Sequence, residues 1–253
     1  MVLKNINRSS ATLLKTLWVA LLLICELKAF TQKLYQKKDP SLPYSFWVYE
    51  PEGYNQKKDW PMIIFLHGRS LSGNDLNLVK KYGVIAEIEK GRKFPAIIIA
   101  PQVKQGESWN PDKIVQCIEN MKNSHSIDSS RISITGMSLG GYGVLHTVGK
   151  YPDKFSSAAA FCGGGKESDA CRLSQVPVWV AHGKKDESVP FTESSSLVEK
   201  IKKCNDDNIK FTIYENGNHG IVERIFRTEE LYLFLVKNKK GEPSFFPNFS
   251  DKR

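Results

Sequence analysis

Ser138, Asp186 and His219 are the residues whose types and spacing best support chemistry. A serine hydroxyl is a poor nucleophile at neutral pH, so it needs a base within hydrogen-bond reach and an acid that orients that base. Ser138 lies in a G-x-S-x-G pattern that begins at Gly136 and ends at Gly140. An apolar segment precedes the pattern and a helical segment follows it, as in a nucleophile elbow. These residues predict nucleophilic catalysis of acyl transfer.

Asp186 and His219 each follow an apolar segment that is typical of a buried strand. Asp186 lies in the loop after Val178–Ala181, and His219 lies in the loop after Phe211–Tyr214. The chain order is therefore Ser, Asp, His, with each residue at the carboxyl end of a predicted strand. Taken singly, these could be a turn serine, a loop-capping aspartate and a surface histidine. Their shared placement favours a catalytic triad, with His219 as general base and Asp186 as its orienter.

An acyl-transfer intermediate also needs donors for its developing oxyanion. The backbone N–H of Leu139, directly after the nucleophile, is one expected donor. The second is expected from the loop after the strand Met62–Leu66, with the N–H of Arg69 favoured and that of Gly68 as the alternative. His67 lies beside this loop, where we expect it to hold the backbone in place, because the base should follow the acid in the chain.

Four side chains are candidates for lining the pocket: His67, Trp109, Tyr142 and Trp179. For the aromatic residues, packing in the core is an equally good interpretation. The sequence contains no C-x-x-C pattern or histidine-rich spacing, so we expect no metal site and no cofactor.

The surrounding pattern predicts the elements that position these residues. Short apolar segments alternate with longer amphipathic ones from Trp47 onward, which is typical of a mostly parallel sheet with helices on both faces. The predicted strands are Tyr44–Tyr49, Met62–Leu66, Ala96–Ala100, Ile132–Thr135, Ser157–Phe161, Val178–Ala181 and Phe211–Tyr214, and the predicted helices are Asn74–Lys90, Pro111–Asn123, Leu139–Tyr151, Phe191–Lys203 and Val222–Lys237. Several strands lack polar alternation, so we expect them to be buried on both faces.

The 253 residues divide into three predicted parts. Residues 1–31 resemble a secretory signal peptide, because basic residues precede a short apolar run and small residues precede Gln32. An uncleaved anchor helix and a lipoprotein are the alternatives. Residues 32–240 form one catalytic domain, and residues 241–253 form a tail that is either loose or pinned by its aromatic side chains. This organisation predicts a secreted or periplasmic protein, with no stable membrane span after cleavage.

The net charge is +9 for the whole chain. Cleavage after Thr31 would leave 32 basic and 26 acidic side chains, a formal charge of +6. The sequence has no Arg-rich helix or basic stripe with interleaved aromatics, so we expect no nucleic-acid partner. After loss of Cys25, the remaining cysteines are Cys117, Cys162, Cys171 and Cys204. Export would permit a disulfide, for which Cys162 and Cys171 are the best candidates.

The chain resembles the phospholipase/carboxylesterase family of α/β-hydrolase esterases and its feruloyl-esterase-like, polyhydroxybutyrate-depolymerase-like and "predicted peptidase" relatives. The matching stretches are Leu66-His67-Gly68, Ile127-Asp128 with Arg131–Gly143, Tyr151–Phe155, Pro177–Pro190 and Tyr214–His219. The resemblance implies an α/β-hydrolase fold and cofactor-free ester hydrolysis through an acyl-enzyme, with Ser138, Asp186 and His219 as the triad. Gly220 departs from many relatives, which have a larger polar residue after the base.

No long insertion separates the strand that begins at Ser157 from the loop of Asp186, so we expect no large lid. An uncapped site would suit a small ester or an acyl group carried on a carbohydrate. A serine peptidase of the prolyl-oligopeptidase type and an inactive hydrolase-fold binding module are the alternative functions. The sequence does not indicate an oligomeric state.

Overall fold

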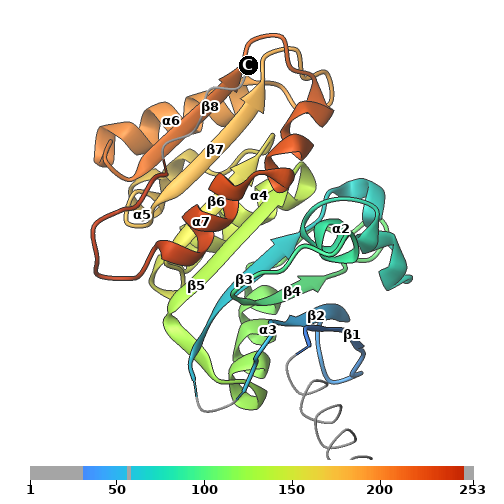
Figure 1. Ribbon diagram of the computed structural model, residues 1–253. Helices are drawn as coiled ribbons and strands as arrows, with labels where there is room; N and C mark the ends of the chain where they lie inside the picture. The colour runs from blue at the N-terminus through green and yellow to red at the C-terminus, as the bar shows by residue number, and fades with distance from the viewer. Residues whose placement is uncertain (1–30, 56–57, 248–253) are drawn as a thin grey trace, which may run out of the picture.

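The computed structural model describes residues 31–55 and 58–247, and these contain one open sheet of eight strands (Figure 1). The strands are β1 (Lys33–Lys37), β2 (Phe46–Glu50), β3 (Trp60–Leu66), β4 (Ile97–Pro101), β5 (Ile127–Met137), β6 (Ser157–Phe161), β7 (Val178–Gly183) and β8 (Ile209–Tyr214). Their order in the sheet is β1-β2-β4-β3-β5-β6-β7-β8. β2 is antiparallel to both of its neighbours, and all the other pairs are parallel. The predicted mostly parallel sheet is therefore confirmed.

Helices cover both faces of the sheet. The α-helices are α2 (Val84–Glu89), α3 (Pro111–Ser124), α4 (Leu139–Lys150), α5 (Ala170–Leu173), α6 (Thr192–Cys204) and α7 (Glu229–Lys237), and the 3-10 helices are η1 (Arg69–Leu71), η2 (Leu76–Lys80), η3 (Pro152–Lys154), η4 (Glu167–Asp169) and η5 (His219–Arg227). Side chains of α3, α4, α5 and α6 belong to one hydrophobic core, and those of α2, η5 and α7 belong to the other (Figure 1). The sheet thus lies between two hydrophobic cores, and helices cover each core on its outer side.

The central strands are buried on both faces, as their lack of polar alternation predicts. Every residue of β3 is buried. Met62, Ile64 and Leu66 contribute to one core, whereas Ile63 and Phe65 contribute to the other. This division follows from the two-residue period of a strand, which sends successive side chains to opposite faces.

Two predicted helices are broken in the structure. The segment Asn74–Lys90 forms η2 and α2, separated by a turn at Gly83 with φ of +77°. A Cβ atom at Gly83 would lie 2.1 Å from Cζ of Phe65, so the tight approach to the sheet excludes a larger residue. The segment Val222–Lys237 is divided at Thr228, which has extended backbone between η5 and α7.

The sequence prediction omitted β1. Its residues, Lys33–Lys37, are mostly polar and partly exposed, because β1 is the edge strand next to β2. An edge strand buries little apolar surface, so its sequence lacks the apolar run that marks the central strands.

The predicted disulfide between Cys162 and Cys171 is wrong. Cys171 on α5 pairs instead with Cys204 at the end of α6, with 5.2 Å between the two Cα atoms. Cys162 is a free, buried cysteine that directly follows β6. The error arises because closeness in sequence does not bring Cys162 and Cys171 together, whereas the packing of α5 against α6 brings Cys204 to Cys171.

The described part of the C-terminal tail is pinned to the domain. The Asn238 side chain donates to the carbonyl oxygen of Phe245 at 2.9 Å and accepts the N–H of Phe245 at 2.9 Å. The ring of Phe246 stacks on Phe234 with 5.2 Å between centroids. This favours the strap interpretation for residues up to 247.

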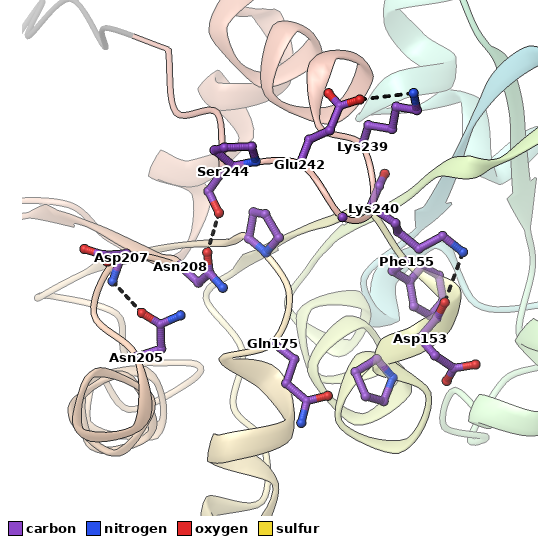
Figure 2. Close-up of a pocket in the computed structure, with 15 residues that line it drawn as sticks. Asp153, Phe155, Gln175, Asn205, Asp207, Asn208, Lys239, Lys240, Glu242 and Ser244 are labelled. Atoms are coloured by element: carbon purple, nitrogen blue, oxygen red, sulfur yellow. Dashed lines mark hydrogen bonds and ion pairs between the residues drawn. The ribbon is translucent and has the colours of Figure 1, made fainter.

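A cavity of about 620 Å³ lies between this tail and the loops that precede β6, β7 and β8 (Figure 2). Among its lining residues, Lys240 donates to the carbonyl oxygen of Asp153 at 3.1 Å, and Ser244 donates to Asn208. Lys239 pairs with Glu242 at 3.0 Å. The polar groups around this cavity thus bond to one another and join the tail to the sheet.

The predicted signal peptide lies outside the described residues, except for Thr31. Within the described ranges, no helix has the length and apolar character needed to cross a bilayer.

Candidate active site

The structure brings the three predicted triad residues together at the carboxyl edge of the sheet. Ser138 directly follows β5, Asp186 follows β7, and His219 follows β8. β5, β6, β7 and β8 are consecutive parallel neighbours, so the loops that leave their carboxyl ends meet at one edge.

Ser138 stands on a strained turn between β5 and α4. Its φ of 57° and ψ of −125° are unusual for a residue with a side chain. The flanking glycines allow this turn to pack closely against β3. A Cβ atom at Gly140 would lie 1.9 Å from the carbonyl oxygen of Leu66, and one at Gly136 would lie 2.6 Å from the same atom. The G-x-S-x-G pattern is therefore explained by close contact between backbones.

The three side chains form a continuous hydrogen-bonded line. Nε2 of His219 lies 3.0 Å from Oγ of Ser138, and Nδ1 of His219 lies 2.7 Å from Oδ2 of Asp186. The Asp186 side chain is fully buried, whereas the His219 side chain is 28% exposed. The imidazole is therefore held by the buried carboxylate through Nδ1, and its Nε2 side reaches the cleft.

Hydrogen bonds favour the ionised form of Asp186. Burial raises the pKa of Asp186, but the N–H of Val189, the ring of His219 and the N–H of Ser188 together hold that pKa below its ordinary value. Both backbone N–H groups donate to Oδ1 at 2.9 Å, which leaves Oδ2 for the imidazole. The carboxylate is thus suited to orient His219 and to stabilise a positive charge on it.

His182 supports the loop of Asp186 from behind. Its Nε2 atom lies 3.0 Å from the carbonyl oxygen of Val189 and 3.2 Å from Oδ2 of Asp186, and its Nδ1 atom lies 2.7 Å from Oγ of Ser194 on α6. Burial lowers the pKa of His182, so its ring is neutral at pH 7. Sequence reasoning missed Ser194, because no local pattern distinguishes it from the neighbouring serines.

The two residues whose backbone N–H groups are the expected oxyanion donors, Leu139 and Arg69, both line the cleft that contains Ser138. Leu139 is the first residue of α4 and Arg69 is the first residue of η1, positions whose N–H groups have no partner inside their helix. The N–H of Gly68, the alternative donor, is already donated to the hydroxyl of Tyr82 at 3.0 Å. Gly68 is therefore not an available donor in this structure.

His67 holds the loop after β3, as expected. Its Nε2 atom accepts the N–H of Val103 at 3.2 Å, its Nδ1 atom lies 2.7 Å from the carbonyl oxygen of Gly68, and its own carbonyl accepts the indole N–H of Trp109 at 3.1 Å. Burial lowers the pKa of His67 to about 4. The neutral ring therefore fixes the backbone that presents Arg69.

A cleft of about 660 Å³ opens above Ser138 and His219. Trp109 and Tyr142 line it, as expected. The expectation is wrong for His67, which is fully buried below the cleft, and for Trp179. The indole of Trp179 donates to Thr212 and packs in the core. The cleft is also lined by Arg69, Ser70, Tyr82 and His146, which the sequence did not single out for this role.

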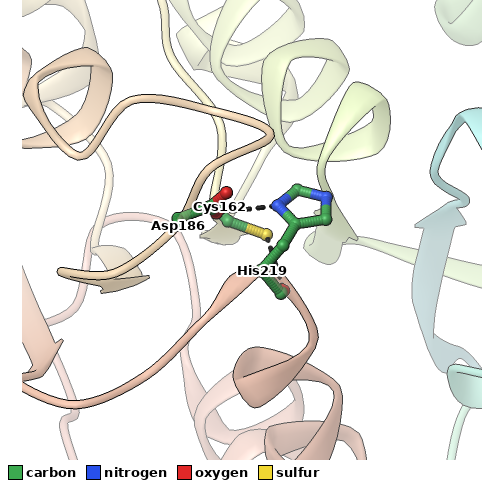
Figure 3. Close-up of side chains that lie close together, drawn as sticks. All are labelled: Cys162, Asp186 and His219. Atoms are coloured by element: carbon green, nitrogen blue, oxygen red, sulfur yellow. Dashed lines mark hydrogen bonds and ion pairs between the residues drawn. The ribbon is translucent and has the colours of Figure 1, made fainter.

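Cys162, Asp186 and His219 are the described side chains whose ligand atoms lie close enough together to hold a metal ion (Figure 3). These atoms lie within 4.8 Å of one another. The hydrogen bond between Asp186 and His219 already uses two of them. Burial raises the pKa of the Cys162 thiol to about 12, so without a bound metal ion the thiol is protonated at pH 7. The arrangement fits a triad better than a metal centre.

The chain matches the model of the phospholipase/carboxylesterase family over residues 95–237. It is 30% identical to poly(3-hydroxyalkanoate) depolymerase C of Paucimonas lemoignei over 117 residues, which are 46% of this chain and 24% of that protein. It is 23% identical to a bifunctional acetylxylan esterase/xylanase of Neocallimastix patriciarum over 163 residues, which are 61% and 23% of the two chains. The chain thus spans about a quarter of the length of these relatives.

Among solved structures, a thermostable esterase aligns with a TM-score of 0.70 and 27% identity, over 84% of this chain and 64% of that chain. This similarity agrees with the open, mostly parallel sheet and its helices, and it confirms the predicted α/β-hydrolase fold. Because the family model covers more than half of the sequence, the chain belongs to the phospholipase/carboxylesterase family.

Proposed function

We propose that the protein is a serine hydrolase that cleaves carboxylic esters through an acyl-enzyme intermediate. The observation that carries this proposal is the line from Ser138 through His219 to Asp186, with distances of 3.0 and 2.7 Å, at the floor of an open cleft. The family membership and the similarity to a solved esterase support the same reaction class.

In the first half-reaction, Oγ of Ser138 attacks the ester carbonyl while Nε2 of His219 takes its proton. The carbonyl oxygen becomes an oxyanion that accepts the N–H groups of Leu139 and Arg69. Collapse of this intermediate breaks the bond to the alcohol, which leaves with the proton from His219. Asp186 stabilises the transient imidazolium.

In the second half-reaction, water replaces the alcohol. His219 takes a proton from the water as its oxygen attacks the acyl carbonyl, and a second tetrahedral intermediate forms at the same oxyanion site. The proton returns to Oγ of Ser138 as the acid leaves. The net reaction is hydrolysis of one ester bond to an acid and an alcohol, with no cofactor.

We further propose that the substrate is a small ester or an acyl group that projects from a bulky carrier such as a polysaccharide. Between β6 and the loop of Asp186, the chain contains only η4, α5 and β7, so no inserted segment covers the cleft from this side. The names of two relatives, a poly(3-hydroxyalkanoate) depolymerase and an acetylxylan esterase, refer to a polyester and to an acetylated polysaccharide, which are both polymeric esters. The disulfide between Cys171 and Cys204 supports the expected export to an oxidising compartment.

Labelling with a fluorophosphonate probe tests the nucleophile. We expect the purified protein to be labelled with one probe per chain, and Ser138→Ala to abolish labelling without changing the thermal unfolding temperature. Ser41→Ala is the control, because it removes a hydroxyl from an exposed turn. Ser133→Ala is unsuitable, because Ser133 is buried and bonded to α7. Labelling of Ser138→Ala to the wild-type level would rule out the proposed mechanism.

A substrate panel separates the alternatives. We expect acetyl, feruloyl and short-chain nitrophenyl esters to be hydrolysed faster than long-chain esters and peptide anilides. A preference for anilides would favour the peptidase alternative, and absence of turnover together with absence of labelling would favour an inactive binding module.

A further inference from the structure

The Tyr82 hydroxyl lies beside the loop that presents Arg69. Its oxygen accepts the N–H of Gly68 at 3.0 Å and lies 3.2 Å from Oγ of Ser70. The side chain is half-buried and lines the cleft of Ser138. Tyr82 therefore reaches the predicted oxyanion site from a segment that sequence patterns do not connect with catalysis.

The position of Gly68 relates the Tyr82 hydroxyl to the nucleophile. A Cβ atom placed on Gly68 would lie 2.7 Å from Oη of Tyr82 and 3.3 Å from Cβ of Ser138. Both side chains thus border the same small volume beside Gly68. The Tyr82 hydroxyl therefore lies near Ser138 and beside the loop after β3, from which the second oxyanion donor is expected.

A rigid turn holds Tyr82 in this place. The next residue, Gly83, has φ of +77°, and a side chain there would collide with the ring of Phe65 in β3. α2 begins directly after this turn. Because a packed strand and a helix fix both sides of the turn, the hydroxyl is preorganised, as an oxyanion donor must be.

The hydrogen bonds of the Tyr82 hydroxyl limit where its own proton can be donated. A phenol has one proton to donate and can also accept hydrogen bonds. Gly68 uses one acceptor position, and the exposed hydroxyl of Ser70 can donate to a second. Oγ of Ser70 can also accept the Tyr82 proton, since either hydroxyl of this pair can be the donor. When Ser70 donates to Tyr82, the Tyr82 proton is available to an oxygen atom in the cleft. Burial raises the pKa of Tyr82, so the phenol keeps its proton at pH 7.

We propose that Tyr82 is a catalytic residue that donates its hydroxyl proton in a hydrogen bond to the oxyanion, as a third donor beside the N–H groups of Leu139 and Arg69. The proposal rests on the proposed serine-hydrolase mechanism and adds a side-chain donor to it. Removal of one oxyanion donor lowers kcat by about 100- to 1000-fold in enzymes of this kind.

The test compares Tyr82→Phe with the wild type on an activated ester and on its thionoester, in which sulfur replaces the carbonyl oxygen. We expect Tyr82→Phe to lower kcat/KM for the ester about 100-fold, mainly through kcat. For the thionoester we expect a much smaller loss, because sulfur is a poor hydrogen-bond acceptor. Tyr35→Phe is the matched control, since it removes a hydrogen-bonded phenol from edge strand β1 and should change neither rate.

Two results would overturn the proposal. Activity of Tyr82→Phe within threefold of the wild type means that the hydroxyl does not assist the reaction. An equal loss on both substrates means that Tyr82 acts only by positioning the loop through Gly68. If Tyr82→Phe does not fold, site-specific replacement of Tyr82 by a fluorotyrosine keeps the shape and strengthens the donor. Its kcat/KM for the ester should then rise below the pKa of the new phenol, and an unchanged or lower value contradicts the proposal.

The wild-type measurements separate this inference from the proposed function. If the wild type neither hydrolyses esters nor reacts with a fluorophosphonate, the serine-hydrolase proposal itself fails. If the wild type does both and Tyr82→Phe behaves like it, only the role of Tyr82 is wrong.

Discussion

Two cavities of similar volume lie at opposite ends of the strands, the carboxyl edge and the amino edge of the sheet. They differ in what their polar groups bond to. The cleft of about 660 Å³ lies at the carboxyl ends of the strands, and the cavity of about 620 Å³ lies at their amino ends. At the carboxyl edge, Ser138 and His219 turn reactive atoms toward the cleft. At the amino edge, Lys240 donates to the carbonyl oxygen of Asp153, and Asn208 accepts the hydroxyl of Ser244 in the tail.

Strand direction explains this difference. In a parallel sheet, each helix that follows a strand begins at the carboxyl edge, so unpaired N–H groups collect there, as at Leu139 in α4 and Arg69 in η1. The amino edge receives the ends of helices and the C-terminal tail. We therefore expect substitutions at the carboxyl edge to change rates, and substitutions at the amino edge to change stability.

The largest effect is expected for Asp186→Asn at the carboxyl edge. The asparagine can still accept the N–H groups of Ser188 and Val189, but its amide disfavours the tautomer of His219 that can accept a proton from Ser138. We expect kcat to fall about 10⁴-fold. Steady-state kinetics on a nitrophenyl ester measures this fall, and a loss below tenfold would show that Asp186 does not orient the base.

Removal of the disulfide should affect stability and leave the rate unchanged. Cys171 and Cys204 are 33 residues apart, and a bridge over this distance stabilises a domain by about 3–4 kcal/mol. We expect the variant with Cys171→Ser and Cys204→Ser to lose this amount in urea unfolding and to keep the wild-type kcat while folded. The reduced wild type is the matched control, and equal stability of reduced and oxidised protein would contradict the expectation.

The sequence predicted the site better than it predicted the packing. The placement of Ser138, Asp186 and His219 follows from a rule about strand ends, which needs only the order of apolar segments along the chain. The disulfide instead depends on how α5 packs against α6, and sequence spacing does not contain that distance. Local sequence patterns were therefore sufficient to predict residues whose position depends on strand direction. They were insufficient to predict a contact that depends on how two helices pack.

The same reason explains the errors within the pocket. Trp179 lies on a strand that leads to the site, yet its side chain points into the core shared with α7. Tyr82 lies 14 residues from Gly68 in the chain and reaches it only because the expected helix is broken at Gly83. A side chain that enters the site from a broken helix has no signal in the apolar periodicity.

A pH-dependent effect of His67 would sharpen the comparison, because this residue lies at the carboxyl edge and yet is expected to affect stability. Its pKa falls from an ordinary 6.5 to about 4 in the folded protein. Between these two values the unfolded chain binds more protons, so stability is fully present above pH 6.5 and is lost as the pH falls toward 4. The difference amounts to about 3 kcal/mol.

Urea unfolding between pH 7 and pH 4 measures this contribution. We expect the wild type to lose about 3 kcal/mol more than His67→Gln over this range, because glutamine does not titrate. The variant should be less stable at pH 7, since His67 accepts the N–H of Val103. Parallel stability curves for the two proteins would mean that His67 is not buried in its neutral form.

The smallest effect is expected for Asn238→Ala at the amino edge. Asn238 is 2% exposed, and its side chain donates to Phe234 and Phe245 and accepts the N–H of Phe245. Its loss leaves buried backbone groups without partners, which costs about 2 kcal/mol. Asn77→Ala, at an exposed position of η2, is the matched control and should change stability by less than about 0.5 kcal/mol. If Asn238→Ala lowered kcat while its stability stayed at the wild-type value, the division of labour between the two edges would be wrong, because a bond of the tail would then control the chemistry at the other end of the strands.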